Sequence, residues 1–484
     1  MFGWSARSAP RRIPSDEVIP AFALDDTSAN RGIMLNWTLH FDAVLDAEKL
    51  RSSLEALLRT GDWRKIGGRL RLDAGGKLEI HVPTIFTTER PAFRYRHTSY
   101  DIKLSEHPIV SRIPVATANP WSRPILTNFA EPDVTDLDEL LYSDLPQLGL
   151  HVLSFTDATL VDLIWPHTMS DAMGCHDLLK NWCHVLAGRE DQVRPFLGYR
   201  TDPLETMLAL SETDCEPWAL RDLVLSGVGV VIFAIRFLIG ILWHPSTEQR
   251  IIFFPERTVT NLRQRATAEL DAGTFLSDGD VLTAWCTRVA TADSKRPVSA
   301  MNVVEMRSRA PAGVFDLGGA YVQNLVFPAF TTFRGGVVHE APMGEMALAI
   351  RRSLAAQVAP GQVAAAARTM AQRTGRQGEG KQPPVVGDPS AQLVVFSNWM
   401  KGKFFEVADF GPAVAKGGDG SSSGTGRPVY MQVMMLGKTS LAVRNVFNFL
   451  GKDAAGNVWA NAVLTSAVWR RVDAELAVLG YAST

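Results

Sequence analysis

The sequence predicts an α/β protein built on mixed sheets. Stretches with the two-residue period of strands and stretches with the helical period interleave along the chain, without the regular strand–helix–strand alternation of a doubly wound parallel fold. Of the 484 residues, 46% are hydrophobic and 21% are charged, which is close to the average for soluble globular proteins. The chain can therefore bury a large core, and its length predicts two or three domains or one large two-lobed unit.

The N-terminal half contains clear strand and helix signals. WTLHF (37–41) predicts a strand, followed by a helix that Asp46 caps and that carries leucines on one face. Residues 61–83 predict two short strands around a Gly-Gly turn. Residues 151–166 are strand-like and end in a dense apolar run, and a further amphipathic helix is expected from Asp171.

The C-terminal half has the same mixture of elements. LSDGDVLTAWCTRVATA predicts a helix in which Ser277 is the cap and Asp280 holds the capping-box position. Strands are expected over 251–255, 298–306, 393–399 and 430–436. A long helical stretch is expected over 343–372, and a terminal helix is expected from about Ser466.

Charge and cysteine content exclude several classes of protein. The formal net charge is −2, from 49 basic and 51 acidic residues, which argues against a nucleic-acid partner. Four cysteines without a C-x-x-C pair make neither a disulfide framework nor a structural zinc site. The first residues contain no apolar signal-peptide region. We therefore expect a cytoplasmic protein without a bound metal.

One long apolar segment, Leu223 to Trp243, complicates this interpretation. Its 21 residues would span a bilayer, but Arg236 lies well inside it and would cost about 2.5–3.5 kcal/mol near the membrane centre. We expect a helix that packs against the body or lies on a membrane surface with the arginine turned outward, and insertion is the alternative.

Two glycine-rich motifs fail in their context. Gly420 to Gly424 satisfies G-x-S-x-G, but it lies in a low-complexity run, whereas a nucleophile elbow needs a strand before it and a helix after it. Gly437-Lys438-Thr439 resembles the end of a phosphate loop, yet Gln432 stands where the first glycine should be.

The informative motif is His167 followed by Asp171, an H-x-x-x-D spacing. His97 and Asp101 have the same spacing, but His97 precedes no predicted helix and fits a surface or structural role. His167 lies between an apolar strand and an amphipathic helix, where folds present side chains to a cleft. An imidazole there suits proton abstraction from an alcohol. The alternative is a satisfied core histidine with Asp171 as a helix cap.

The motif occurs together with four other blocks in a fixed order. They are FDAVLDAEKLRSSLEALLRTGDW, LSDGDVLTAW, VVEMRSRAP and VVFSNWMKGKFFEVADFG. Together with TLVDLIWPHTMSDAMG, they make the chain similar to the BAHD acyltransferase family, which has H-x-x-x-D in the middle and D-F-G-W-G toward the end. The resemblance covers most of the chain and is closest to fungal members that modify secondary metabolites, such as trichothecene 3-O-acetyltransferase-like proteins.

The resemblance implies two similar lobes of the chloramphenicol acetyltransferase type with a solvent channel between them. The N-terminal lobe would comprise residues 1–205, the crossover 206–250, and the C-terminal lobe 251–484. The motif histidine would lie mid-channel, with acyl-CoA entering from one face and the acceptor from the other.

Individual roles follow from the same resemblance. His167 is the expected general base, and Asp171 is chiefly structural and pairs with an arginine, for which Arg307 matches best and Arg309 next. Gly174 would let the backbone pack closely. Further along the chain, a channel-lining pair, Ser397 and Trp399, would include a candidate oxyanion donor in Ser397, and the second motif, Asp409, Phe410 and Gly411, would support the lobe and the CoA side.

The chain departs from the family pattern after the second motif. Pro412 replaces the tryptophan, and a Gly/Ser-rich insertion follows. Lys416 and Arg427 flank this insertion and are candidates for contacting the CoA phosphates, although solvated charges are the alternative.

The implied reaction transfers an acyl group, acetyl by preference, from acyl-CoA to a hydroxyl of a secondary metabolite such as a terpenoid or polyketide. Acyl-CoA would be a co-substrate, with no tightly bound cofactor, and the protein would be a monomer. One alternative is a condensation-type enzyme that uses a carrier-protein thioester, which Pro166 disfavours because it fills the place of the first of two adjacent histidines. The other is a non-catalytic protein that binds a ligand or a membrane. The sequence does not reveal the acceptor.

Overall fold

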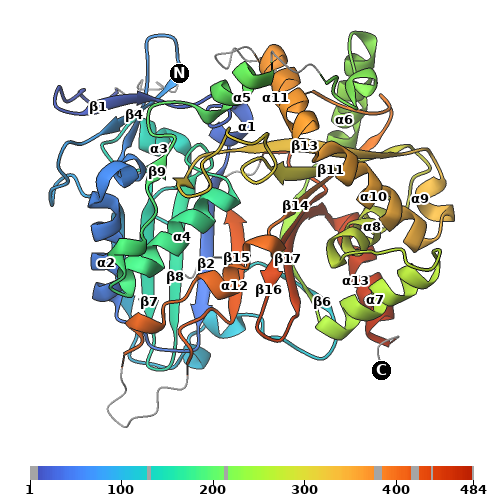
Figure 1. Ribbon diagram of the computed structural model, residues 1–484. Helices are drawn as coiled ribbons and strands as arrows, with labels where there is room; N and C mark the ends of the chain where they lie inside the picture. The colour runs from blue at the N-terminus through green and yellow to red at the C-terminus, as the bar shows by residue number, and fades with distance from the viewer. Residues whose placement is uncertain are drawn as a thin grey trace, which may run out of the picture.

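Two mixed sheets form the framework of the computed structural model, which describes residues 9–127, 132–211, 216–374, 384–415, 424–437 and 440–481 (Figure 1). The first sheet consists of β15 (Tyr430–Met435), β2 (Met34–Phe41), β8 (Thr159–Pro166), β7 (Gly149–Ser154) and β5 (Arg94–Ser99), in that order. The second consists of β13 (Val326–Phe333), β11 (Val298–Glu305), β14 (Gln392–Asn398), β16 (Val446–Lys452), β17 (Val458–Thr465), β10 (Thr247–Phe254) and β6 (Trp121–Pro124). Both sheets contain parallel and antiparallel pairs, so the predicted α/β class with mixed sheets is confirmed.

Each sheet takes its edge strand from the other half of the chain. In Figure 1 the orange strand β15 lies beside the blue strand β2, and Met431 pairs with Leu39. Conversely, β6 joins β10 in the second sheet, where Ser122 pairs with Ile252. A small parallel ladder between β9 (Phe196–Leu197) and β12 (Ala320–Tyr321) joins the halves again. By the expected boundaries at 205 and 251, β6 belongs to the N-terminal lobe and β15 to the C-terminal lobe. In the structure, β6 joins the second sheet and β15 joins the first.

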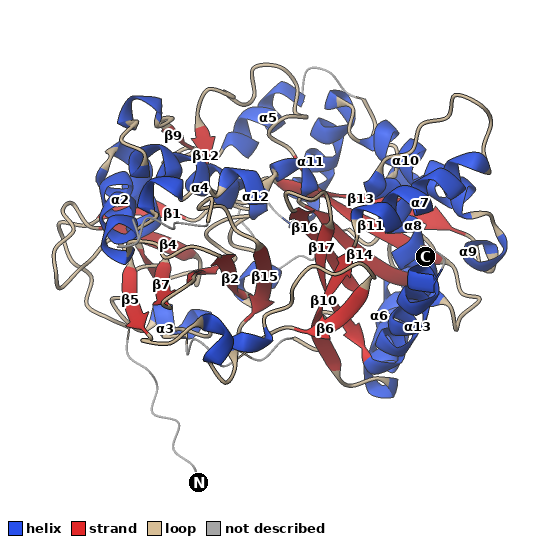
Figure 2. Cartoon of the chain, turned by 90° about the horizontal axis from the view of Figure 1, so that it is seen from below, coloured by secondary structure: helices blue, strands red, loops and turns tan. Residues whose placement is uncertain are grey.

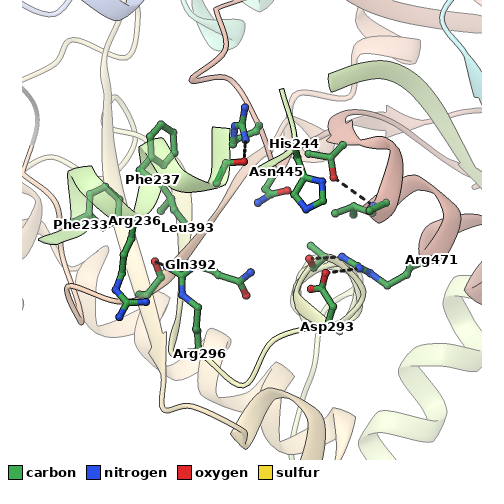
Figure 3. A pocket seen from close by; sticks show the side chains of 17 residues that line it. Phe233, Arg236, Phe237, His244, Asp293, Arg296, Gln392, Leu393, Asn445 and Arg471 are labelled. Atoms are coloured by element: carbon green, nitrogen blue, oxygen red, sulfur yellow. Dashed lines mark hydrogen bonds and ion pairs between the residues drawn. The ribbon is translucent and has the colours of Figure 1, made fainter. Parts of the chain in front are cut away.

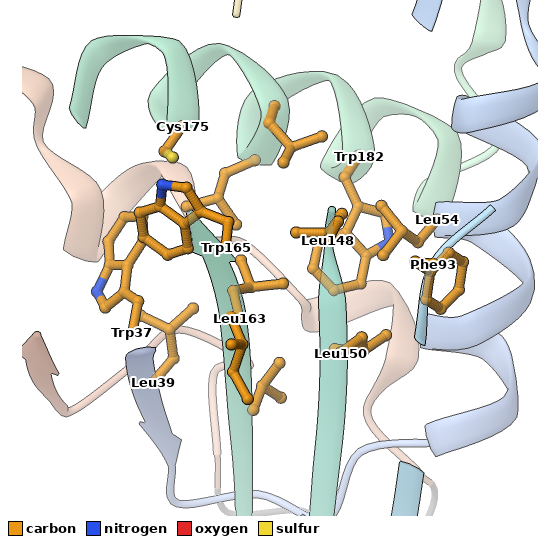
Figure 4. Close-up of a cluster of buried hydrophobic side chains, with 14 of the residues drawn as sticks. Trp37, Leu39, Leu54, Phe93, Leu148, Leu150, Leu163, Trp165, Cys175 and Trp182 are labelled. Carbon is orange, nitrogen blue, oxygen red and sulfur yellow. The ribbon is translucent and has the colours of Figure 1, made fainter. Parts of the chain in front are cut away.

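Helices cover one face of the first sheet and bury its aromatic side chains. The long helices there are α2 (Ala47–Arg59) and α4 (Ala172–Leu186). Figure 4 shows Trp37 and Trp165 from the sheet, with Trp182 reaching in from α4. All three indoles are at most 2% exposed, and the Trp182 Nε1–H donates to Ser53 Oγ of α2. This core fixes α4, and thereby the turn before it, on the end of β8.

The remaining elements lie around both sheets, with β1 (Glu17–Pro20), β4 (Leu78–Val82) and α3 (Leu137–Leu141) on the side of the first sheet (Figure 2). A three-stranded antiparallel sheet contains β1, β4 and β3 (Arg69–Leu72). The longer helices are α5 (Pro203–Ser211), α6 (Val228–Trp243), α7 (Glu256–Ala268), α8 (Asp278–Thr291), α10 (Met343–Gln357), α11 (Pro360–Thr374) and α13 (Ser466–Tyr481), and the short ones are α1 (Ser28–Arg31), α3 (Leu137–Leu141), α9 (Val337–Glu340) and α12 (Phe404–Val407).

Local signals in the sequence account for several element ends. Asp46 caps α2 by accepting from the Lys49 N–H, and Ser277 and Asp280 form both bonds of a capping box at α8. The strand-like stretch 151–166 falls in two antiparallel strands, and the helical stretch 343–372 forms two helices because Pro360 starts a new one.

The apolar segment 223–243 is also not one continuous helix. Residues 221–223 form a short 3₁₀ turn, Gly227 has a positive φ of 50°, and α6 begins only at Val228. Among the residues that the structure describes, no helix is both long and apolar enough to cross a membrane. α6 lies at the outer edge of the second lobe, and none of its side chains is buried.

Candidate active site

His167 occupies the turn that leaves β8, and its main chain is held from both halves of the protein. Its N–H donates to Ile33 O (2.9 Å) just before β2, and its carbonyl accepts from Asn324 Nδ2 (2.8 Å) in the C-terminal half. The residue as a whole is half-buried. The backbone at this point is thus fixed from both halves of the protein.

The electrostatics of the ring favour its neutral form. Burial lowers the pKa of His167, and the residue's own main chain, the Asp171 carboxylate and the Asn324 side chain oppose this only in part. Nδ1 is buried and meets no hydrogen-bond partner among the described residues. A neutral imidazole keeps a lone pair at neutral pH, and a base needs that lone pair.

Asp171 has the opposite character, because both of its oxygens are fully used. As the cap of α4, its Oδ1 accepts from the Gly174 N–H (2.8 Å), and its Oδ2 accepts from the Leu325 N–H (2.8 Å). Arg307 donates to both oxygens at 3.0 and 2.9 Å. The side chains of this ion pair are only 6% and 9% exposed. Asp171 is therefore both the helix cap and the partner of Arg307, and Arg309 instead pairs with Glu305.

A segment of the C-terminal half, residues 321–325, is clamped onto the start of α4. Arg307 donates to the carbonyls of Tyr321 and Gln323, and Asp177 of α4 accepts from the Tyr321 N–H. Gly174 makes the close approach feasible, because a Cβ there would lie 3.1 Å from Tyr321 O and 2.1 Å from Ser170 Oγ. The buried ion pair thus ties the His167 turn to the other half of the chain.

Ser397 and Trp399 lie at the end of β14 and bond to each other. The Trp399 Nε1–H donates to Ser397 Oγ (2.8 Å), which leaves the serine hydroxyl hydrogen free to donate elsewhere. Trp399 packs against Trp37 of β2 at 6.1 Å between ring centroids, and Trp37 packs against Trp165 of β8 at 6.2 Å. These tryptophans connect the end of β14 to the strand that His167 follows.

The second motif is built around a buried phenylalanine. Phe410 is 0% exposed and contacts Phe41 and Trp182 with centroid distances of 5.2 and 4.7 Å. Asp409 accepts from the Gly411 N–H, and it forms a half-exposed ion pair with Arg427 at 3.4 Å. The motif therefore packs behind α4, remote from the turn of His167. Lys416, the other candidate CoA contact, lies outside the described residues, as does most of the G-x-S-x-G run.

Sequence reasoning missed Asn324, which connects His167 to a second buried carboxyl group. Asp25 accepts from both the N–H and the Nδ2 of Asn324, and burial raises the pKa of Asp25 to about 7. No motif surrounds Asn324, and only the folded chain brings it to His167. Among the described residues, no three histidine, cysteine, aspartate or glutamate side chains gather as metal ligands do.

Comparisons with known proteins agree with this arrangement. No family model matches the chain. The O-acetyltransferase PaAT-2 of Phomopsis amygdali is 40% identical, over 96% of this chain and 98% of its own length. The acetyltransferase pyiB of Pyricularia grisea is 37% identical, over 95% and 94%. A relative from Penicillium decumbens, 36% identical over 98% of both chains, is named transcriptional regulator calD.

The fold is shared with a solved enzyme. The crystal structure of F. graminearum TRI101 complexed with coenzyme A and T-2 mycotoxin has a TM-score of 0.65 at 16% identity, and the match covers 95% of this chain and 97% of that chain. Fold and relatives together define an enzyme that transfers acyl groups. The chain belongs to the BAHD-type family of CoA-dependent O-acyltransferases, in its branch of fungal acetyltransferases. The motifs in the sequence predicted this family.

Proposed function

We propose that the protein transfers an acetyl group from acetyl-CoA to a hydroxyl of a secondary metabolite, such as a terpenoid or a polyketide, with His167 as general base. The observation that carries the proposal is the contrast inside the H-x-x-x-D turn. Burial lowers the pKa of the His167 ring, which favours its neutral form, and the residue is half-buried, whereas the two oxygens of Asp171 are occupied by structural bonds. The histidine is thus available for chemistry, and the aspartate holds the turn.

In the proposed reaction, Nε2 of His167 accepts the proton of the acceptor hydroxyl as the oxygen attacks the thioester carbonyl. Nδ1 is buried, so Nε2 is the nitrogen left for the substrate. A new C–O bond forms, and the carbonyl π electrons move to the oxygen of a tetrahedral intermediate. Collapse of the intermediate breaks the C–S bond, and the CoA thiolate takes up the proton from His167. The products are an ester and free CoA, with no covalent enzyme intermediate.

Ser397 is the proposed donor to the oxyanion. Its oxygen already accepts from Trp399, so its own hydrogen is free to donate to the substrate. Loss of one such donor commonly costs about 2.7–4 kcal/mol of transition-state stabilisation. Ser397→Ala is therefore expected to lower kcat by about 10²–10³, while KM for acetyl-CoA changes little. For the CoA phosphates we keep Lys416 and Arg427 as proposed contacts.

The test is CoA thiol release from acetyl-CoA with a panel of hydroxylated terpenoids and polyketides. Wild-type protein is expected to release thiol with at least one acceptor, and His167→Ala to lose about 10²–10⁴-fold in rate while remaining folded. His97→Ala, which alters the other H-x-x-x-D histidine, is the matched control and is expected to keep full activity. A folded His167→Ala protein with near wild-type thiol release would disprove the base assignment.

We also propose where the enzyme works: as a cytoplasmic monomer that docks on a membrane surface through α6. The support is the state of this helix, in which Val228, Leu242 and Trp243 are 74%, 79% and 79% exposed. Monomeric proteins rarely expose a contiguous apolar surface of this kind without a partner for it. A helix lying in the interface would bury these side chains among lipid chains.

A further inference from the structure

The space beneath α6 has an unusual lining for a protein with nearly balanced charge. A cavity of about 130 Å³ separates the helix from α8, α13 and the strand β14, and four guanidinium groups but one carboxylate line it. The guanidinium groups belong to Arg236, Arg296, Arg444 and Arg471, and the carboxylate is that of Asp293. Figure 3 shows Arg236 and Arg296 on one side of this space and Asp293 with Arg471 on another.

Most of this positive charge is not neutralised by ion pairs. Asp293 pairs with Arg471 at 2.9 Å. Arg296 donates to the carbonyls of Ser390 and Ala391, and Arg444 donates to those of Gly240 and Leu441, which carry no net charge. These bonds fix both guanidinium groups in place without cancelling their charge.

Arg236 is the least engaged of the four. It makes no hydrogen bond or ion pair within the described parts of the chain, and Asp388, a carboxylate whose pKa its charge helps to lower, already accepts from Ser390. Burial, and in second place the charge of Arg236, lowers the pKa of Arg296, so the two like charges repel each other. An anion between them would relieve this repulsion.

Polar atoms without partners occur at the same place. Gln392 Oε1 and Asn445 Oδ1 both line the cavity, and both are buried without a hydrogen-bond partner among the described residues. Either amide can turn to present its NH₂ group instead, because its two orientations have the same shape. The cavity therefore offers donors and charge for a small anion with several oxygens.

The cavity opens beside the bare apolar surface of α6. A second, larger space of about 590 Å³ shares Arg236, Arg296 and Asp293 with the first, and its lining also includes Ile232, Ile239 and Trp243 of the helix. Basic groups next to exposed apolar side chains suit the boundary of a bilayer, where a phosphate lies a few ångströms above the acyl chains. A soluble anion would make no use of the apolar side chains.

We propose that the cavity under α6 binds the phosphate of an anionic lipid headgroup, with Arg236 and Arg296 as its principal contacts. The inference rests on the membrane-surface location proposed above and names the lipid class that the surface selects. In this arrangement α6 lies flat, with Leu238 and Leu242 among the acyl chains, and the guanidinium groups beneath it hold the headgroup. Acyl transfer at His167 does not depend on this contact.

The experiment is co-sedimentation of the full chain with vesicles of phosphatidylcholine alone or mixed with phosphatidylserine. Wild-type protein is expected to bind the anionic vesicles at least about fivefold more tightly, since one basic residue near such a surface contributes about that factor. Arg236→Gln is expected to remove most of this preference. Arg352→Gln, which removes an exposed charge from α10, is the matched control and is expected to retain the preference.

Other outcomes separate the two proposals. If Arg236→Gln keeps the wild-type preference while Leu238→Ser/Leu242→Ser loses all vesicle binding, docking stands and the headgroup site is wrong. If no vesicle binds wild-type protein, both the location and the headgroup site are wrong, and concentration-dependent dimerisation would then show that a second copy covers α6. Stabilisation by inorganic phosphate that requires Arg236, without vesicle binding, would overturn the lipid as the source of the anion.

Discussion

Two helices of similar length, α4 and α6, differ completely in what surrounds them. Ten of the 15 residues of α4 are buried, whereas none of the 16 residues of α6 is, although α6 is far more apolar. α4 alternates polar and apolar positions, so one face packs on the sheet while Asp171 and Asp177 bind the other half of the chain. Apart from Arg236, α6 is apolar all round, and its Phe233, Phe237 and Gly240 face the cavity that lies between the helix and the body. Pattern, rather than apolar content, decides which helix is built into the core.

Of the changes considered for the two helices, breaking the ion pair at the start of α4 should lower the free energy of unfolding the most. Arg307→Ala leaves Asp171 buried without its charged partner, and such losses cost about 3–5 kcal/mol. We expect the free energy of unfolding, measured by urea denaturation, to fall by this amount and activity to fall with it. Arg427→Ala removes a half-exposed ion pair and should change stability by less than about 1 kcal/mol. Equal effects of the two variants would contradict the structural role of the Asp171 pair.

Two glycine substitutions give opposite expectations for the two helices. Gly174→Ala places a Cβ against Ser170 Oγ and the 321–325 backbone, and crowding of this kind costs about 1–3 kcal/mol. Gly240→Ala in α6 meets nothing within 4 Å and should gain up to about 1 kcal/mol from better helix propensity. Thermal unfolding of both variants provides the measurement, and a stabilised Gly174→Ala protein would refute the close packing at α4.

The pH dependence of acyl transfer tests the neutral ring at the α4 turn. Because the pKa of His167 is lowered from its ordinary value of 6.5, more than half of the rings stay neutral at pH 6.5. We expect kcat/KM at pH 6.5 to exceed half of its plateau, with the acidic limb centred below that pH. The same shift makes the unfolded chain bind more protons, so this group lowers stability as the pH falls below about 6.5. A limb centred above 6.5 would indicate a different titrating group.

The smallest effect is expected in α6. Leu242→Ser replaces a side chain that is 79% exposed and should change the free energy of unfolding by less than about 0.5 kcal/mol. Leu179→Ser in α4 replaces a fully buried leucine and should cost about 2–5 kcal/mol. If Leu242→Ser destabilised the protein in dilute buffer as strongly as Leu179→Ser, α6 would have to be packed in solution.

The local parts of this molecule could be predicted from the sequence, and the non-local parts could not. The caps at Asp46 and Ser277 follow from side chains that bond within one helical turn. The pairing of Asp171 with Arg307 followed from the family resemblance alone, since 136 residues separate the two. Asn324 at the carbonyl of His167 had no signal, because neither periodicity nor motif marks a single amide. Likewise, the composition of 223–243 indicated length and apolarity but not the break at Gly227.

The exchange of edge strands between the sheets has a consequence for how the chain is made. Until β15 emerges near residue 430, β2 remains an open edge with unpaired main-chain groups, although the rest of its sheet was synthesised hundreds of residues earlier. The N-terminal half must therefore wait, incomplete and exposed to wrong partners, for almost the whole of translation. A chain cut near residue 250 would yield two halves that each lack a strand, so the enzyme is better regarded as one interlocked folding unit than as two modules joined by a linker.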